Sequence, residues 1–79
     1  MASFEVHIVR QAESEFLKVP FPFRRQLNQA LSKLQDEPRP AAAVVIDSNI
    51  YRLTVHGWSA VFEVDDRART VTIYRISPL

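Results

Sequence analysis

The segment YRLTVHGWSAVFEVDD, residues 51–66, constrains the fold more than any other part of the sequence. Apolar and polar side chains alternate on both sides of His56-Gly57, as they do in strands that bury one face. Gly57 is the only glycine of the chain and accepts a positive φ angle, which histidine also tolerates better than most residues. We therefore predict an antiparallel hairpin with a two-residue turn at His56-Gly57.

This turn sets which side chains share a face of the hairpin, because successive side chains of a strand point to opposite sides. One face is entirely apolar and comprises Tyr51, Leu53, Val55, Trp58, Ala60 and Phe62. The opposite face, which we call the open face, comprises Arg52, Thr54, Ser59, Val61 and Glu63. Thr54 is predicted directly across from Ser59, and Arg52 diagonal to both Ser59 and Glu63. We expect helices to cover the apolar face and to leave the open face bare.

The rest of the chain indicates an α+β domain. Proline at positions 20 and 22 separates two segments with the apolar spacing of helices, and the segments around them alternate as strands do. The predicted strands are residues 4–9, 44–46, the two arms of the hairpin, and 70–76, and the predicted helices are residues 11–19 and 22–36. We expect one domain, residues 1–79, with an N-terminal strand and a two-helix hairpin packed on one face of a mainly antiparallel four- to five-stranded sheet.

Composition excludes several kinds of site. The chain has 79 residues and no cysteine, so disulfides, thiolate metal sites and cysteine nucleophiles are ruled out. We predict no metal and no cofactor, because histidine clusters and glycine-rich phosphate loops are missing. Without a membrane-length apolar run or a signal-peptide pattern, the expected location is the cytoplasm. The net charge of +1 gives little long-range attraction for nucleic acid, although eight of the ten basic residues are arginine.

The last strand adds further side chains to the open face. If Val71 and Ile73 point to the core, Thr72 and Tyr74 lie on the open face and Arg75 has the parity of the core; a β-bulge would swap Tyr74 and Arg75. His56 is expected at the rim of this face. Two plainer interpretations remain open: Arg52 and Glu63 form an ordinary cross-strand ion pair, and His56 only forms the turn.

Three stretches, taken in order, resemble the RelE/ParE toxin superfamily of bacterial toxin–antitoxin modules. They are HIVRQAESEFLKVP at 7–20, RRQLNQALSKLQDEPRP at 24–40 and IYRLTVHGWSAVFEVDDRARTVTIYRI at 50–76, and they span nearly the whole chain. The resemblance implies a helical hairpin on an antiparallel sheet, and a toxin silenced by an antitoxin. One branch of the superfamily cuts mRNA at the ribosome through attack of the ribose 2′-hydroxyl on the adjacent phosphate, and another inhibits DNA gyrase.

The pattern of this superfamily is matched only in part. Arg52 stands at a basic position of the IYRL phrase, whereas Thr54 and Ser59 occupy two positions that the resemblance expects to be basic. A basic tail carrying another arginine and often a tyrosine is expected after the last strand, where this sequence reads Ser77-Pro78-Leu79. Each lost donor to a transition state costs on the order of 3 kcal/mol, so the resemblance implies an mRNA endoribonuclease with a depleted site. The alternative is a binding protein without catalysis, either a gyrase inhibitor or a degenerate toxin.

The resemblance and the register together give a set of candidate site residues. For RNA cleavage we expect Arg52 to stabilise phosphate charge, His56 or Tyr74 to transfer protons, and Arg75 to substitute for a missing cation. Contacts to the RNA backbone are expected from Arg24, Arg25, Lys33 and Arg39, although such a helix face is usually only a solvated surface. Trp58 and Phe62 are expected at an apolar edge that an antitoxin helix or a second copy of the chain covers.

Overall fold

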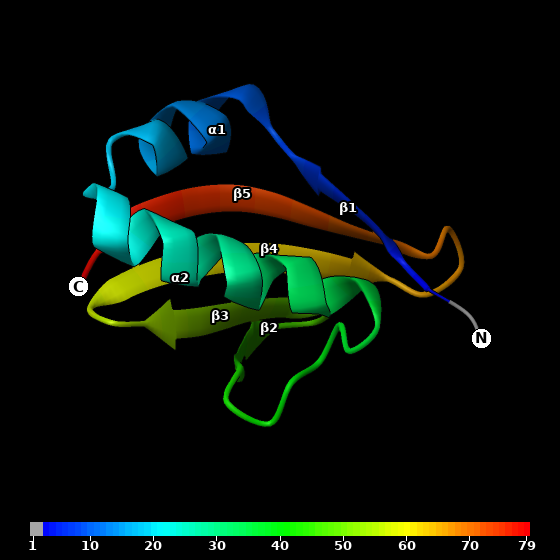
Figure 1. The fold of residues 1–79 in the computed structure, drawn as a ribbon. Helices are drawn as coiled ribbons and strands as arrows, with labels where there is room; N and C mark the ends of the chain where they lie inside the picture. The colour runs from blue at the N-terminus through cyan, green and yellow to red at the C-terminus, as the bar shows by residue number, and fades with distance from the viewer. Residues whose placement is uncertain (1–2) are drawn as a thin grey trace.

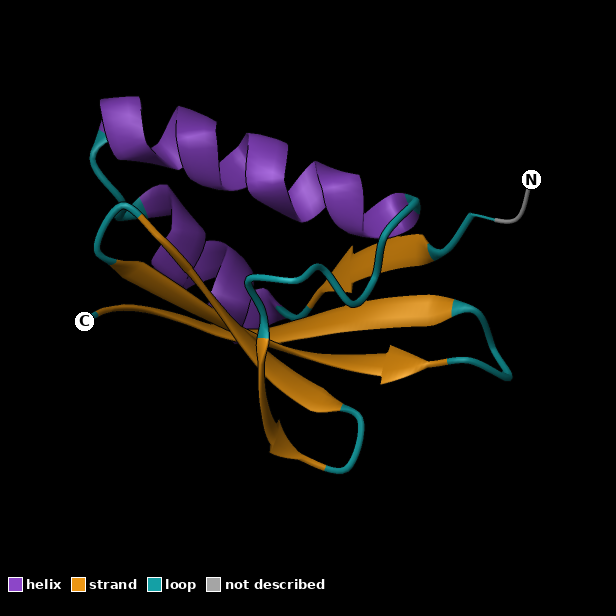
Figure 2. Ribbon diagram, turned by 90° about the horizontal axis from the view of Figure 1, so that it is seen from below, coloured by secondary structure: helices purple, strands orange, loops and turns teal. Residues whose placement is uncertain are grey.

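The computed structural model describes residues 3–79 and shows two helices packed on one side of a five-stranded sheet (Figures 1 and 2). The sheet order is β1-β5-β4-β3-β2. The strands are β1 Glu5–Ile8, β2 Val44–Asp47, β3 Ile50–Val55, β4 Trp58–Asp65 and β5 Thr70–Pro78, and the helices are α1 Arg10–Leu17 and α2 Phe21–Ser32, followed by a short 3-10 helix, Lys33–Gln35. β1 is parallel to β5 and the other pairs are antiparallel, so the predicted α+β class is confirmed.

The β3–β4 hairpin has the predicted turn and register. His56 and Gly57 have φ angles of 49° and 84°, the pair of positive values that a two-residue turn of this hand requires. Val55 pairs with Trp58, and the register continues to Tyr51 opposite Phe62. The two-residue periodicity then places the six residues of the predicted apolar face on the helix side and leaves Val61 on the open face with Arg52, as predicted.

The two helices begin within one residue of their predicted starts but end earlier than predicted, α1 at Leu17 and α2 at Ser32, although a 3-10 helix continues the second to Gln35. Pro22 lies in the first turn of α2, where its missing N–H costs no helical hydrogen bond. Ala12 of α1 and Leu27 and Leu31 of α2 are buried against the sheet. Val19, in the short connection between the helices, is also buried and ties that connection to the core.

A β-bulge in β5 changes the predicted faces of its last residues. Phe62 pairs with Ile73 and Val61 with Arg75, so Tyr74 is an extra residue between the two pairs. Both Tyr74 and Arg75 are exposed, and Ile76 returns to the core at 2% exposure. The predicted core parity of Arg75 is therefore wrong, because the bulge turns it outward. The predicted swap is also wrong for Tyr74, which stays on the open face.

Phe62 lies at the centre of the core and not at an apolar surface edge. Its side chain is 0% exposed and its ring stacks on Tyr51 with centroids 5.8 Å apart. The expectation that Phe62 binds a partner is therefore wrong, since Phe62 is fully buried in the core cluster that also holds Leu27 and Leu31 of α2. Trp58 is partly buried against the same core.

The β2 strand is the least covered part of the sheet. All of its residues are exposed, and Val44, Val45 and Ile46 keep 54%, 63% and 49% of their surface in solvent. β2 pairs only with β3, and a bulge interrupts that pairing between Val45 and Asp47. Its outer edge therefore carries apolar side chains without a neighbouring strand.

Candidate functional site

Arg52 is the unpaired cation of the open face. It lies in β3 between Val44 of β2 and Val61 of β4, on the side of the sheet opposite the helices. Its side chain is exposed and makes no ion pair or side-chain hydrogen bond with any of residues 3–79. A guanidinium held on a strand without a carboxylate partner keeps its full charge and all its donors for an anion such as phosphate.

The ion pair between Arg52 and Glu63, which the sequence left open as a plainer interpretation, does not form. Glu63 instead accepts a hydrogen bond of 3.0 Å from Tyr74, whose Oη donates to Oε1. This bond, together with partial burial, raises the pKa of Tyr74 and keeps the phenol protonated. The plainer interpretation of Arg52 as one half of a cross-strand pair is therefore wrong for this structure.

Arg75 shares the row of Arg52 but is held at the edge of the sheet. Val61 pairs with Arg52 on one side and with Arg75 on the other. Arg75 donates from Nε to Oε2 of Glu15 at 3.1 Å, while Oε1 of Glu15 accepts the backbone N–H of Ile76 at 2.7 Å. Glu15 of α1 thus offsets the charge of Arg75.

The backbone hydrogen bond from Ile76 is the main reason why the pKa of Glu15 is lowered, with smaller contributions from Gln11 and Arg75. Glu15 is therefore ionised well below neutral pH. It supplies an acceptor to β5 beyond the point where the pairing with β1 ends, since that pairing stops at Ile73.

His56 lies on the helix side of the sheet and not at the rim of the open face. Its ring faces Phe23 of α2 with centroids 6.5 Å apart. It also lines a pocket of about 320 Å³ between α2 and the hairpin, together with Leu53 and Val55 of the core face. The structure thus separates His56 from Arg52 and Tyr74, which contradicts the predicted grouping and favours the interpretation of His56 as a turn residue.

Thr54 and Ser59 form the cross-strand pair that the register predicts. They are direct partners in the hairpin, and Ser77 of β5 completes the row. Ser59 is only 7% exposed. This end of the open face is therefore polar and carries no charge.

Three of the basic residues proposed for RNA contacts, Arg24, Arg25 and Lys33, belong to the helix layer and lie away from Arg52. Arg24 donates from Nη1 to the carbonyl of Leu17 at 3.1 Å and thereby joins the two helices. Arg25 and Lys33 are exposed on α2 and at the start of the 3-10 helix that follows it. Both helices lie on one side of the sheet (Figure 2), and the open face is the other side, so residues of the helix layer do not share a surface with Arg52.

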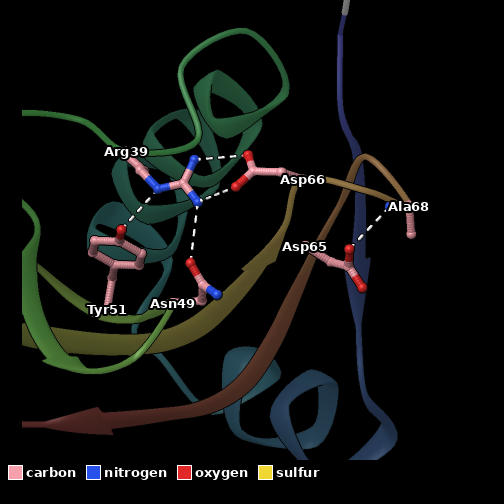
Figure 3. A network of polar contacts seen from close by, with 6 residues as sticks. All are labelled: Arg39, Asn49, Tyr51, Asp65, Asp66 and Ala68. Carbon is pink, nitrogen blue, oxygen red and sulfur yellow. Dashed lines mark hydrogen bonds and ion pairs between the residues drawn. The ribbon is translucent and has the colours of Figure 1, made fainter.

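Arg39 is the centre of a polar network and not a free cation (Figure 3). Its guanidinium donates to both carboxylate oxygens of Asp66 at 2.9 and 2.7 Å, to Tyr51 Oη at 2.7 Å and to Asn49 Oδ1 at 3.3 Å. These bonds lower the pKa of Asp66 and raise the pKa of Arg39. Arg39 therefore joins the loop after the helices to β3 and to the β4–β5 turn, and the proposed RNA contact is not supported.

Sequence reasoning gave no chemical role to two side chains that the structure places on the open face. Glu63 was placed on this face but not given a chemical role, and its bond to Tyr74 depends on a bulge that the sequence does not mark. His7 pairs with Thr72, which pairs with Glu63, so it also lies on the open face, where its Nε2 is 3.2 Å from Oε1 of Glu5. The alternation around His7 was visible, but its neighbours depend on the parallel pairing of β1 with β5.

Neither a metal site nor a membrane-spanning helix is found in the part of the chain that the structure describes. Residues 3–79 contain no group of three or more His, Cys, Asp or Glu side chains arranged to hold a metal ion. No helix within the same range has the length and apolar character needed to cross a bilayer.

Solved structures identify the fold. No protein-family model matches the sequence, and no curated protein is significantly similar to it. The structure superposes on the RelBE2 toxin–antitoxin complex of Mycobacterium tuberculosis with a TM-score of 0.85, 16% identity and coverage of 99% of this chain and 100% of that chain. The chain has the RelE fold. A match to the intact Escherichia coli RelBE complex has a TM-score of 0.85 and 20% identity over 98% of both chains.

The RelE fold also relates this chain to a toxin solved by itself. The isolated E. coli RelE toxin gives a TM-score of 0.83 at 22% identity, and the match covers 98% of this chain and 84% of that chain. The fold that the sequence resemblance implied is therefore confirmed. In this RelE fold the open face carries Arg52, Glu63 and Tyr74, and the helix face carries His56.

Proposed function

We propose that this chain is the toxin of a type II toxin–antitoxin module and that its open face acts on RNA in the bacterial cytoplasm. The observation that carries the proposal is the match to RelE proteins over nearly the full length of both chains, several of them solved as toxin–antitoxin complexes. A bare sheet face with the unpaired guanidinium of Arg52 supports it, because phosphodiester chemistry needs a cation for the charge that develops on phosphate.

A protein partner is part of this proposal. The structural neighbours are held by RelB antitoxins in complexes from M. tuberculosis, E. coli and Pyrococcus horikoshii. The present chain exposes apolar side chains that a partner can bury, among them Phe21 at 66% and Val45 at 63% exposure. We therefore propose a cognate antitoxin that binds this chain and blocks its activity.

Controlled expression tests the proposed function. The chain is induced in a bacterial host alone and together with the protein encoded by the neighbouring open reading frame, and growth is followed. We expect the chain alone to stop growth and the neighbour to restore it. Arg52→Ala should relieve the inhibition, whereas Arg67→Ala, which removes an exposed arginine from the β4–β5 turn, should leave it intact. A chain that neither slows growth nor binds the neighbouring product is not such a toxin.

One observation favours a second candidate function, a toxin-fold protein that acts only by binding. Thr54 and Ser59 face each other where the resemblance expects basic residues, and the structure confirms their pairing. On this alternative the target is a protein such as DNA gyrase. Mapping of mRNA 5′ ends after induction separates the two functions, because new cuts require RNA cleavage, whereas a DNA-damage response without cuts indicates gyrase.

A further inference from the structure

The bulge in β5 brings an acid–base pair next to the unpaired arginine. Tyr74 is the inserted residue, and insertion leaves its phenol on the open face at 41% exposure while its Oη bonds Glu63. Bulges often occur beside active sites, where they redirect a side chain. In this strand the bulge costs a break in the β4–β5 pairing, and Tyr74 contributes no core contact that would offset the cost.

The register fixes how this pair lies relative to Arg52. Val61, in the middle strand β4, is half-buried and pairs with Arg52 of β3, while Tyr74 projects from β5 on its other side. Glu63 lies two residues along β4 on the same face, diagonal to Arg52, and such neighbours are separated by roughly 7–8 Å, within reach of long side chains. A phosphate placed above Val61 therefore lies between the guanidinium of Arg52 and the Glu63–Tyr74 pair.

We propose that Glu63 and Tyr74 are the proton-transfer pair of an RNA-cleaving site on the open face, with Arg52 holding the scissile phosphate. This inference rests on the proposed function and assigns the chemistry of its site. It replaces His56, which lies on the other side of the sheet, and it needs neither Arg75 nor a cation at positions 54 or 59.

The reaction balances with these residues alone. The ribose 2′-oxygen forms a bond to phosphorus and gives its proton to the Glu63 carboxylate. The bond from phosphorus to the 5′-oxygen breaks, and that oxygen takes the phenolic proton of Tyr74. Glu63 then returns a proton to the Tyr74 phenolate along their existing hydrogen bond. The products are a 2′,3′-cyclic phosphate and a 5′-hydroxyl, and both side chains recover their starting states.

The two members suit these roles. Glu63 accepts one hydrogen bond and retains a second carboxylate oxygen for the 2′-hydroxyl. The phenol of Tyr74 is protonated at neutral pH, as an ordinary tyrosine is, and the bond to Glu63 raises its pKa further, so a donor is present when the leaving oxygen needs one. Arg52 offers several N–H donors to the phosphate oxygens, and none of them is occupied by another of residues 3–79.

The test measures cleavage of a reporter mRNA in a cell-free translation reaction, with selective sequencing of 5′-hydroxyl ends. Glu63→Gln keeps the size and the acceptor of the side chain, and Tyr74→Phe removes only the hydroxyl. We expect each change to slow cleavage by about 100-fold or more, the usual effect of losing a general acid or base. Glu37→Gln, at an exposed carboxylate on the helix side, is the matched control and should cleave at the normal rate. Circular dichroism verifies that each variant folds.

The double variant distinguishes a pair that acts together from two separate groups. If Glu63 and Tyr74 pass one proton between them, Glu63→Gln with Tyr74→Phe should be no slower than the slower single variant. Losses that multiply in the double variant contradict the relay. Normal cleavage by either single variant overturns the assignment of that residue.

Failure of this inference is separable from failure of the proposed function. A chain that stops growth and is neutralised by its neighbour, yet produces no 5′-hydroxyl ends, overturns the proton-transfer pair and leaves the toxin assignment standing. A chain that has no effect on growth and binds no neighbour overturns both.

Discussion

Arg39 and Asp66 are joined by two parallel hydrogen bonds, from Nη1 to Oδ1 at 2.9 Å and from Nη2 to Oδ2 at 2.7 Å. The partners are 27 residues apart in the sequence, and the same guanidinium also bonds Tyr51 and Asn49. The guanidinium is planar and directs its N–H donors to several acceptors at once, two of them on the same carboxylate. A lysine ammonium does not have this geometry.

Replacement of Arg39 should therefore lower stability without affecting the open face. We expect Arg39→Ala to reduce the melting temperature by about 5 °C, a modest loss because the network is partly exposed and screened. Arg39→Lys should recover little of it. Arg67→Ala, in the neighbouring turn, serves as the control and should melt like the natural sequence. If Arg39→Lys and the natural sequence have the same melting temperature, then the positive charge at position 39, and not the planar guanidinium, provides the stability.

Glu15 should make stability depend on pH in the acid range. The pKa of Glu15 is lowered in the folded state, mainly by the N–H of Ile76. The ionised carboxylate therefore stabilises the fold fully above the ordinary glutamate pKa of about 4.3. This stabilisation is lost as the pH falls through the lower pKa that Glu15 has in the folded state. We expect Glu15→Gln to melt below the natural sequence at pH 7 and the gap to close below about pH 4. A gap that persists unchanged at acid pH would contradict this origin.

The hairpin turn gives a prediction about backbone strain. Gly57 has a φ of 84°, and a Cβ added there would meet no other atom within 4 Å. Gly57→Ala should therefore lower the free energy of unfolding by about 1 kcal/mol, only because alanine disfavours a positive φ. Urea denaturation measures it. If Gly57→Ala unfolds at the same urea concentration as the natural sequence, the turn differs from the one described.

His56→Asn separates a turn residue from a catalytic one. Asparagine is favoured before glycine in this turn, so we expect the free energy of unfolding to rise by about 0.5 kcal/mol and growth inhibition to persist. The same urea denaturation and the growth assay provide both measurements. Loss of toxicity in a stably folded His56→Asn protein would restore the original assignment of His56 to proton transfer.

A cation added at Thr54 should strengthen RNA binding. Thr54 is exposed on the open face two residues from Arg52, and Thr54→Lys adds one phosphate contact there. For single-stranded RNA the slope of log affinity against log salt should steepen by about 0.7, as measured by fluorescence anisotropy. Thr54→Gln has a similar length without the charge and should leave the slope unchanged. An unchanged slope in Thr54→Lys would place RNA elsewhere than the open face.

The parts of the fold that follow from local pattern were predictable from the sequence. The hairpin register needed only the alternation and a single glycine, and the helix starts needed only proline and apolar spacing, whereas the helix ends were predicted two to four residues too late. The bulge at Tyr74 was not marked, because no glycine or other signal accompanies it. Long-range partners were also hidden: the bonds from Glu15 to Arg75 and to the backbone of Ile76 join α1 to a strand some 60 residues away. Both features that the sequence did not indicate, the bulge and the contacts of Glu15, involve predicted site residues, Tyr74 and Arg75.

The uncovered apolar margin at β2 has a practical consequence for making this protein. Unpaired backbone groups flanked by Val44, Val45 and Ile46 can template further strands, and β2 has no lysine to deter such stacking. Cells that produce the chain by itself should accumulate part of it as inclusion bodies. A lysine at position 45, or a companion that occupies this border, should return it to the supernatant.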